Sequence, residues 1–209
     1  MSVGKLDDIV VDFLNLVQTD ASTLDERGIA DYLIKALETL ACDDITEDKH
    51  SGMQGNTGNI IARFPGKIDG SLLLSAHMDR VQGGRGIKPV VGPKTIKSDG
   101  NTILAADDVA GLVAILDGVR RIKESGSDHS TIEVVFTYAE EKQLLGSSNL
   151  DYSKLESDYA FVFDSSGPVG RIINSAPSTA QLLLKVHGKS AHAGVEPEKG
   201  INATVIAAK

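Results

Sequence analysis

Residues 71–81 read Ser71-Leu72-Leu73-Leu74-Ser75-Ala76-His77-Met78-Asp79-Arg80-Val81. The apolar beginning of this segment is typical of a buried strand, and its end carries a histidine and an aspartate two positions apart. Because side chains at positions i and i+2 of a strand point to the same side, we expect His77 and Asp79 to face one way. A carboxylate beside an imidazole suits a metal site, since it fixes the tautomer and orientation of the ligating ring. A histidine and an aspartate that only bond loop backbone would give the same short motif, so the rest of the chain has to decide.

The composition of the 209-residue chain, with 41% hydrophobic and 24% charged residues, is ordinary for a globular protein. A net charge of −8 argues against the long basic patches that a phosphate backbone requires, and therefore against nucleic acid as a partner. Residues 1–8 lack the charged-then-apolar pattern of a secretory signal, and no apolar run reaches membrane-spanning length. These observations predict a cytoplasmic protein without a membrane partner. Cys42 is the only cysteine, which excludes an intrachain disulfide and a thiolate metal site.

Apolar periodicity predicts two helices near the N-terminus, one over residues 6–18 and one that runs to Leu40. The second helix is opened by Thr23-Leu24-Asp25-Glu26, which has the form of a capping box. A third helix is predicted after Ala105-Ala106-Asp107-Asp108. Besides the His77 strand, we expect strands at 45–46, 59–64, 130–138 and 159–163 (the last one buried), a loop or small hairpin within 89–97, and short helices within 146–155 and 202–209.

This alternation of helices with apolar strands predicts an α/β fold with a mixed, mostly parallel sheet that is covered by helices on both faces. In such sheets, ligands bind beyond the carboxyl ends of the strands. Four groups of acidic or imidazole side chains occur at junctions of this kind: His77 with Asp79, Asp107 with Asp108, Glu140 with Glu141, and Asp164. Unrelated surface charges have no reason to recur at every strand exit, whereas divalent cations need carboxylates and imidazole that converge from separate loops.

Four segments carry a recognisable pattern in this order: Ser-Ala-His-Met-Asp-Arg-Val at 75–81, Ala-Ala-Asp-Asp-Val-Ala-Gly at 105–111, Tyr-Ala-Glu-Glu at 138–141 and Phe-Asp-Ser-Ser-Gly at 163–167. Together they resemble the two-zinc metallopeptidases that include peptidase T, aminoacylase and the carboxypeptidase G type, and the peptidase T-like or tripeptidase-like branch most of all. The segment from Gly188-Lys189-Ser190-Ala191-His192-Ala193-Gly194 to Gly200-Ile201-Asn202-Ala203 resembles the start of the family's lid or dimerisation domain. The resemblance implies a catalytic domain over residues 1–176 and the beginning of a smaller α+β lid over residues 177–209.

The resemblance also implies two divalent metal ions, zinc first, with cobalt and manganese compatible with the same ligands. His77 would bind one ion, Asp164 would complete that ion's site, and Asp107 would bridge the two ions. Glu141 would bind the second ion. Asp108 is expected to cap the helix that follows, because one of two adjacent aspartates before a helix can cap it while the other is aimed elsewhere.

Three further roles follow from the same resemblance. Asp79 would orient His77 from behind. Glu140 would be the general base that takes a proton from metal-bound water and passes it to the departing amine. His192 would steady the substrate's carbonyl oxygen in the active site of the partner subunit, which implies a homodimer formed through the lid.

The activity implied is hydrolysis of peptide bonds in short peptides with a free amino end, as in an aminopeptidase or tripeptidase. A deacylase of N-acyl amino acids would share the metal site and remains an alternative, as does a non-catalytic module that has kept the fold. Complete family members return to the catalytic domain after the lid and there supply a last histidine to the second metal, whereas no histidine follows His192 here. The sequence therefore predicts a C-terminally truncated chain, with sheet edges and apolar faces that lose their cover.

Overall fold

The computed structural model describes residues 7–178, 180 and 182–209. The chain divides into two compact units between Gly167 and Pro168. The functional boundary expected at residues 176 and 177 falls within the second of these units. No helix among the described residues combines the length and the apolar character that crossing a bilayer requires.

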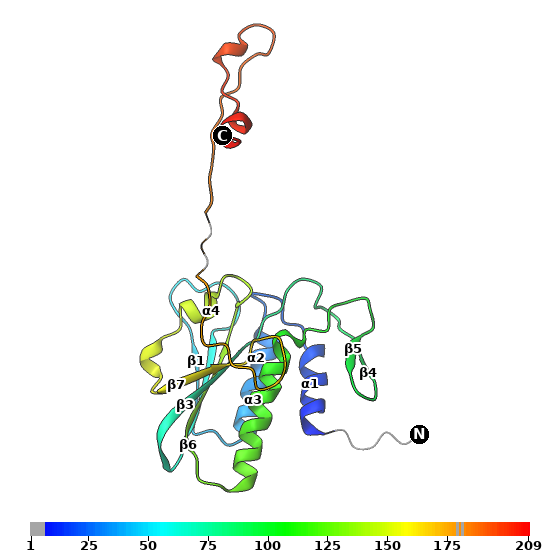
Figure 1. The fold of residues 1–209 in the computed structure, drawn as a ribbon, viewed down its shortest axis with the longest axis vertical. Helices are drawn as coiled ribbons and strands as arrows, with labels where there is room; N and C mark the ends of the chain where they lie inside the picture. Colours follow the sequence, from blue (N-terminus) through cyan, green and yellow to red (C-terminus); the bar gives the residue numbers. More distant parts are fainter. Residues whose placement is uncertain (1–6, 179, 181) are drawn as a thin grey trace. The chain divides into compact units, whose positions relative to one another are not determined.

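A five-stranded sheet with the order β1-β2-β6-β3-β7 forms the centre of the first unit (Figure 1). Strand β2 pairs antiparallel with β1 and β6, whereas β3 pairs parallel with β6 and β7, so that four of the five strands run in one direction. The strands are β1 (Asp44–Asp48), β2 (Asn59–Phe64), β3 (Ile68–His77), β6 (Ser130–Thr137) and β7 (Tyr159–Val162). The mixed, mostly parallel sheet expected from the sequence is confirmed.

Three helices cover one face of this sheet: α1 (Asp8–Gln18), α2 (Arg27–Thr39) and α3 (Ala106–Ser125) (Figure 1). Alternate side chains of the central strands point to that face, among them Phe64 of β2 and Phe136 of β6, both fully buried. They pack into one cluster with Leu16, Leu33 and Leu112 from the three helices. The apolar helix faces, which repeat every 3.6 residues, and the apolar strand faces, which repeat every two residues, therefore pack into a single core.

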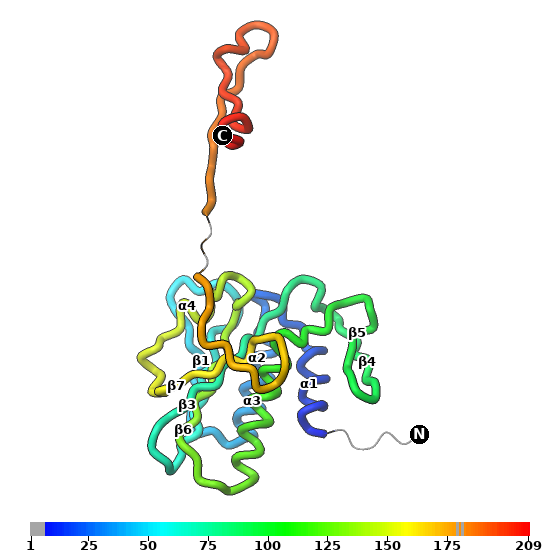
Figure 2. The backbone as a smooth tube through the Cα atoms, in the orientation of Figure 1, coloured from blue at the N-terminus to red at the C-terminus, as the bar shows by residue number. Residues whose placement is uncertain are grey.

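The opposite face carries far less cover. Ile61 and Val135 point to it and pack with Leu150. Leu150 lies between α4 (Leu145–Ser148) and the 3₁₀ helix η1 (Tyr152–Lys154). Helical segments thus lie on both faces, as predicted, but the main core lies on one of them. Figure 2 follows the backbone from β6 through this short helical segment to β7.

Strand β7 departs from the sequence-based expectation of a buried strand. All four of its residues are exposed, with Tyr159 at 73% and Phe161 at 46%. Among the described strands, β7 pairs with β3 alone and forms an edge of the sheet. Apolar composition predicts a strand that can be buried, but it does not reveal whether another segment covers it.

The capping box predicted at Thr23-Leu24-Asp25-Glu26 is wrong. The N–H of Asp25 donates to the carbonyl of Ser22 at 2.7 Å, and Leu24 has a left-handed φ of 72°, so these residues form a tight turn, and α2 begins only at Arg27. The hydroxyl of Thr23 donates to Oδ2 of Asp79 at 2.8 Å instead of accepting from the helix. Both side chains of the expected box therefore serve contacts outside α2.

Two smaller parts complete the description. Between β3 and α3, the predicted hairpin is present as β4 (Pro89–Val91) and β5 (Ile96–Ser98), which pair antiparallel. The described residues of the second unit contain the 3₁₀ helix η2 (Pro197–Lys199) and the helix α5 (Ala203–Ala207). The side chain of Asn202 caps α5 by accepting from the N–H of Val205 at 3.2 Å, which explains why the predicted helix begins there.

Candidate metal centre

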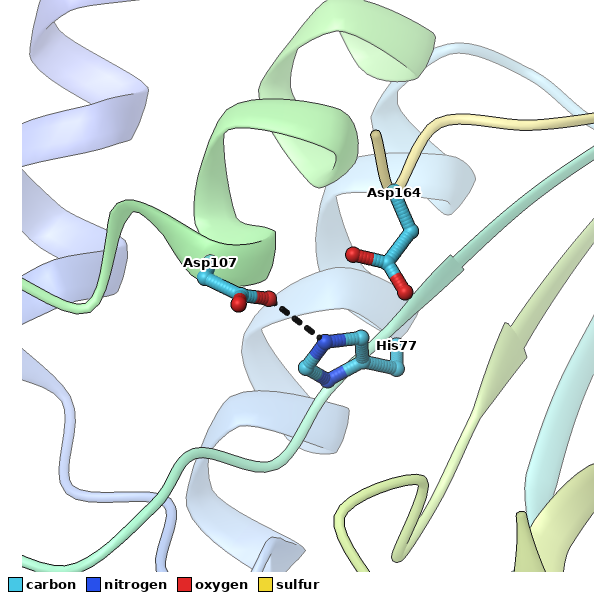
Figure 3. Close-up of side chains that lie close together, drawn as sticks. All are labelled: His77, Asp107 and Asp164. Carbon is cyan, nitrogen blue, oxygen red and sulfur yellow. Dashed lines mark hydrogen bonds and ion pairs between the residues drawn. The ribbon is translucent and has the colours of Figure 1, made fainter. Parts of the chain in front are cut away.

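The candidate site lies where the parallel strands β3, β6 and β7 end and α3 begins. His77 is the last residue of β3, Glu140 and Glu141 follow β6, and Asp164 follows β7. Asp107 stands at the start of α3, next to these strand ends (Figure 3). The sequence-based expectation that the acidic groups gather beyond the carboxyl ends of the strands thus agrees with the topology.

The imidazole of His77 is the centre of this group. Its ring is buried, with 3% of the side chain exposed, and its Nε2 lies 2.9 Å from Oδ1 of Asp107 (Figure 3). Its Nδ1 lies 3.4 Å from Oδ1 of Asp79, a contact too poorly aligned for a full hydrogen bond. A carboxylate that faces one ring nitrogen, with a second carboxylate at the other, is the arrangement in which a ligating histidine is oriented from behind.

Asp108 caps α3, as expected from the sequence, whereas Asp107 makes a different contact. Oδ1 of Asp108 accepts from the N–H of Gly111 at 3.0 Å and so caps the regular part of α3, while Oδ2 accepts from the N–H of His77 at 3.2 Å. Asp107 has φ −88° and ψ 107°, outside the helical region, and its exposed carboxylate points to His77. One carboxylate therefore joins α3 to the end of β3, and its neighbour is free to act as a ligand.

A glycine makes this arrangement possible. A Cβ atom at Gly111 would collide with the carboxylate of Asp108 and with the carbonyl oxygen of Phe163. Only a residue without a side chain lets the first turn of α3 approach both the cap and the exit of β7. Asp107 precedes Asp108 and Asp164 follows Phe163, so this close approach brings the carboxylates of Asp107 and Asp164 near each other.

Two groups of possible ligand atoms result. The ligand atoms of His77, Asp107 and Asp164 all lie within 4.8 Å of one another, and so do those of His77, Glu140 and Glu141. The first group consists of the three residues to which the resemblance gives the first ion. Glu141 is grouped with Glu140 and His77 rather than with the expected bridge Asp107. Imidazole and carboxylate oxygens form a donor set that suits zinc, cobalt or manganese.

His192 belongs to the second unit. There, its Nδ1 accepts from the N–H of Gly194 at 3.2 Å, within an exposed turn. This contact is local and leaves the role inferred from the resemblance as a prediction.

The charges at the site are unbalanced. Burial would lower the pKa of His77, but the carboxylates of Asp79 and Asp107 outweigh it and raise that pKa to about 10. Burial, together with the neighbouring carboxylates, raises the pKa of Glu140, Glu141 and Asp164 in spite of the opposing effect of His77. Several carboxylates thus compete for one imidazolium, and a divalent cation would relieve their mutual repulsion.

The turn that carries Glu140 and Glu141 is held by Asp79, whose bonds to it sequence reasoning did not predict, and by two groups that sequence reasoning missed. Asp79 accepts from the N–H of Glu140 at 2.8 Å and from that of Glu141 at 3.3 Å, in addition to its contact with His77. The hydroxyl of Thr23 and the carboxylate of Glu26 also bind this region. No sequence signal could have indicated the last two, because both matched a local capping pattern.

A cavity of about 200 Å³ adjoins these candidate ligands. Its lining includes the charged or titratable side chains of His77, Glu140 and Asp164 and the apolar side chains of Leu144 and Val162.

Comparison with known proteins gives the following matches. The model of "Peptidase family M28" matches residues 59–199. "Uncharacterized protein YqjE" of Bacillus subtilis (strain 168) is 42% identical over 203 residues, which cover 96% of this chain and 54% of that protein.

Two solved structures are similar over nearly the whole chain. The aminopeptidase PepT from Bacillus cereus ATCC 10987 has a TM-score of 0.78 at 37% identity, and a tripeptidase from Staphylococcus aureus subsp. aureus Mu50 has a TM-score of 0.78 at 31% identity. Each match covers 96% of this chain and 54% of the other. The chain therefore spans about half the length of the relatives it matches.

Proposed function

The chain belongs to peptidase family M28, and on that basis we propose that the full-length protein is a metal-dependent hydrolase of peptide bonds in short peptides, of the aminopeptidase or tripeptidase kind. The observation that carries the proposal is the convergence of His77, Asp107 and Asp164 at the carboxyl edge of the sheet. The similarity to an aminopeptidase and a tripeptidase supports the substrate class. It also agrees with the peptidase T-like resemblance found in the sequence.

We assign two divalent ions to the site, zinc first, with cobalt or manganese as substitutes. His77, Asp107 and Asp164 would hold one ion and Glu141 the other, with Asp107 shared between them. When bound, such ions supply activation of water and polarisation of the scissile carbonyl. The buried ring of His77 and the surplus of carboxylates support this assignment.

The chain's own residues supply orientation and proton transfer. Asp79 faces Nδ1 of His77 at 3.4 Å and so leaves Nε2 directed at Asp107 and the ligand side. Glu140 is the general base in this proposal, taking a proton from the attacking water and passing it to the leaving amine. Burial and neighbouring carboxylates raise its pKa, and a base whose pKa is nearer to neutrality can both accept and release the proton.

The second unit enters the proposal through His192. We place a catalytic domain over residues 1–176 and the start of a lid over residues 177–209, through which the full-length protein forms a homodimer. In this arrangement, His192 of one subunit acts in the other subunit's active site. Mixing Glu140→Gln protein with His192→Ala protein tests it, because only a heterodimer would then contain one intact site. Recovery of activity is expected, and its absence at a proven exchange of subunits would contradict the arrangement.

The function itself is tested on zinc-loaded full-length protein with a panel of dipeptides, tripeptides and N-acyl amino acids. We expect hydrolysis of tripeptides with a free amino end. Glu140→Gln should abolish turnover and leave zinc binding unchanged, since glutamine cannot accept the proton. Activity confined to N-acyl amino acids would assign a deacylase instead, and full activity of Glu140→Gln would exclude Glu140 as the base.

A further inference from the structure

Glu26 is a buried carboxylate that the proposed chemistry does not use. It precedes α2, and its exposed fraction is 0%. Its Oε1 accepts from the N–H of Leu24 at 2.9 Å and from the N–H of Ala139 at 3.0 Å. Its Oε2 is buried and has no hydrogen-bond partner among the described residues.

Ala139 is the residue at which the chain turns after β6. It has a left-handed φ of 47°, which is unfavourable for a residue with a Cβ atom. Glu140 and Glu141 follow directly, and their N–H groups donate to Asp79. Three consecutive backbone N–H groups, those of residues 139–141, are therefore bound by two carboxylates, and Glu26 holds the first of them.

A purely local role explains Glu26 poorly. Its side chain makes no capping bond to the N–H groups of α2. Burying a carboxylate with one unbonded oxygen costs free energy, which is reflected in burial raising its pKa to about 7. An apolar side chain at the same place would avoid this cost, but it would leave the N–H of Ala139 without a partner.

We infer that Glu26 is a positioning residue, whose bond to the N–H of Ala139 fixes the turn that presents Glu140 and Glu141 to the metal site. The inference rests on the proposed function, since it assigns the second ion to Glu141. It separates the site into two parts. Among the described residues, the hydrogen bonds of Glu26 go to Leu24 and Ala139 and not to the elements that carry His77, Asp107 and Asp164, so the turn at residues 139–141 is the part of the site that depends on it.

The variants follow from the geometry. Glu26→Leu removes the acceptor, so the turn relaxes. The affinity for the ion bound by Glu141 then falls by tenfold or more, as is usual when a support behind a ligand is lost. Glu26→Gln keeps an oxygen that can accept from both N–H groups, and its NH₂ takes the position of Oε2, which has no partner among the described residues. This variant should therefore behave like the wild type. Asp48→Leu is the matched control, because Asp48 is a buried carboxylate that accepts from the N–H of Asp151, in a turn without ligands.

The experiment combines amide hydrogen exchange at residues 139–141 with a cobalt(II) titration followed by absorbance, both on the full-length protein. We expect Glu26→Leu to lose amide protection at these residues and affinity for one ion only, with Glu26→Gln and Asp48→Leu unchanged in both. If Glu26→Leu fails to fold, Glu26→Asp, which keeps the charge but withdraws the oxygen, takes its place with the same expectation.

The two readouts separate failure of this inference from failure of the proposed function. Unchanged protection at residues 139–141 in Glu26→Leu or Glu26→Asp would overturn the inference whatever metal is bound. Equal loss of protection in Asp48→Leu would reduce Glu26 to a general stabilising role and would overturn it too. A wild type that takes up no cobalt would instead count against the proposed function, and the amide exchange would still decide whether Glu26 fixes the turn.

Discussion

Replacing Asp79 by Asn should weaken zinc binding by about 10- to 100-fold, the usual effect of losing a carboxylate behind a ligating histidine. The asparagine side chain would keep one oxygen, which can still accept from the N–H of Glu140 as Oδ1 of Asp79 does at 2.8 Å. Its NH₂ group would face the N–H of Glu141, where Oδ2 of Asp79 now accepts at 3.3 Å, so two donors would oppose each other. The negative charge beside Nδ1 of His77 would also be lost.

In free energy, this change in affinity corresponds to about 1.4–2.8 kcal/mol, at 1.4 kcal/mol for each factor of ten. The loss of a charged acceptor for a buried N–H should in addition lower the free energy of unfolding of the metal-free chain by about 1.5–3 kcal/mol. Competition with a chromophoric zinc chelator measures the first quantity, and urea unfolding in the presence of EDTA measures the second. Asp99→Asn is the control, because Asp99 is exposed and its hydrogen bonds within the described part of the chain go to nearby Asn101. A zinc affinity of Asp79→Asn within twofold of the wild type would refute the orienting role of Asp79.

Three further predictions concern zinc binding and the core. In a calorimetric zinc titration of the full-length protein, we expect two sites in the wild type and the loss of one in His77→Ala; an unchanged stoichiometry would remove His77 from the ligands. Leu112→Ala should lower the free energy of unfolding by about 2–5 kcal/mol, because Leu112 is fully buried under the sheet, whereas Val11→Ala, at a side chain that is 41% exposed, should change it by much less; a loss below 1 kcal/mol at Leu112 would contradict the described core. Zinc at 100 times its dissociation constant should stabilise the chain by about 2.7 kcal/mol and raise Tm by about 5–10 °C, reversibly with EDTA, and a Tm that does not respond to zinc would argue against a preformed site.

The elements that place the site could be predicted because their signals are local. The apolar run that ends in His77 and the alternating run that ends before Glu140 each state where a strand stops and which charged group follows it. Adjacent aspartates before a helix likewise indicate one cap and one free carboxylate. For these residues, the same short segment of sequence indicates both the secondary structure and the charged group that follows it.

What could not be predicted depends on contacts between distant parts of the chain. Glu26 and Ala139 are 113 positions apart, and no local pattern links a residue before α2 to the turn after β6. The capping-box pattern even pointed to a different use of Glu26. The exposure of Phe161 has the same origin, since the apolar content of a strand says nothing about which segment, if any, lies over it.

The close approach at Gly111 has a consequence for metal selectivity. The missing methyl group there sets how near the first turn of α3 can come to the exit of β7, and hence the span between the carboxylates of Asp107 and Asp164. Adding a single carbon would push these two segments apart and widen the opening for the ion. In the proposed site, the affinity for cations of different radius would then depend on the backbone of a residue that does not contact them, so helix packing would tune the choice of metal together with the proposed ligands.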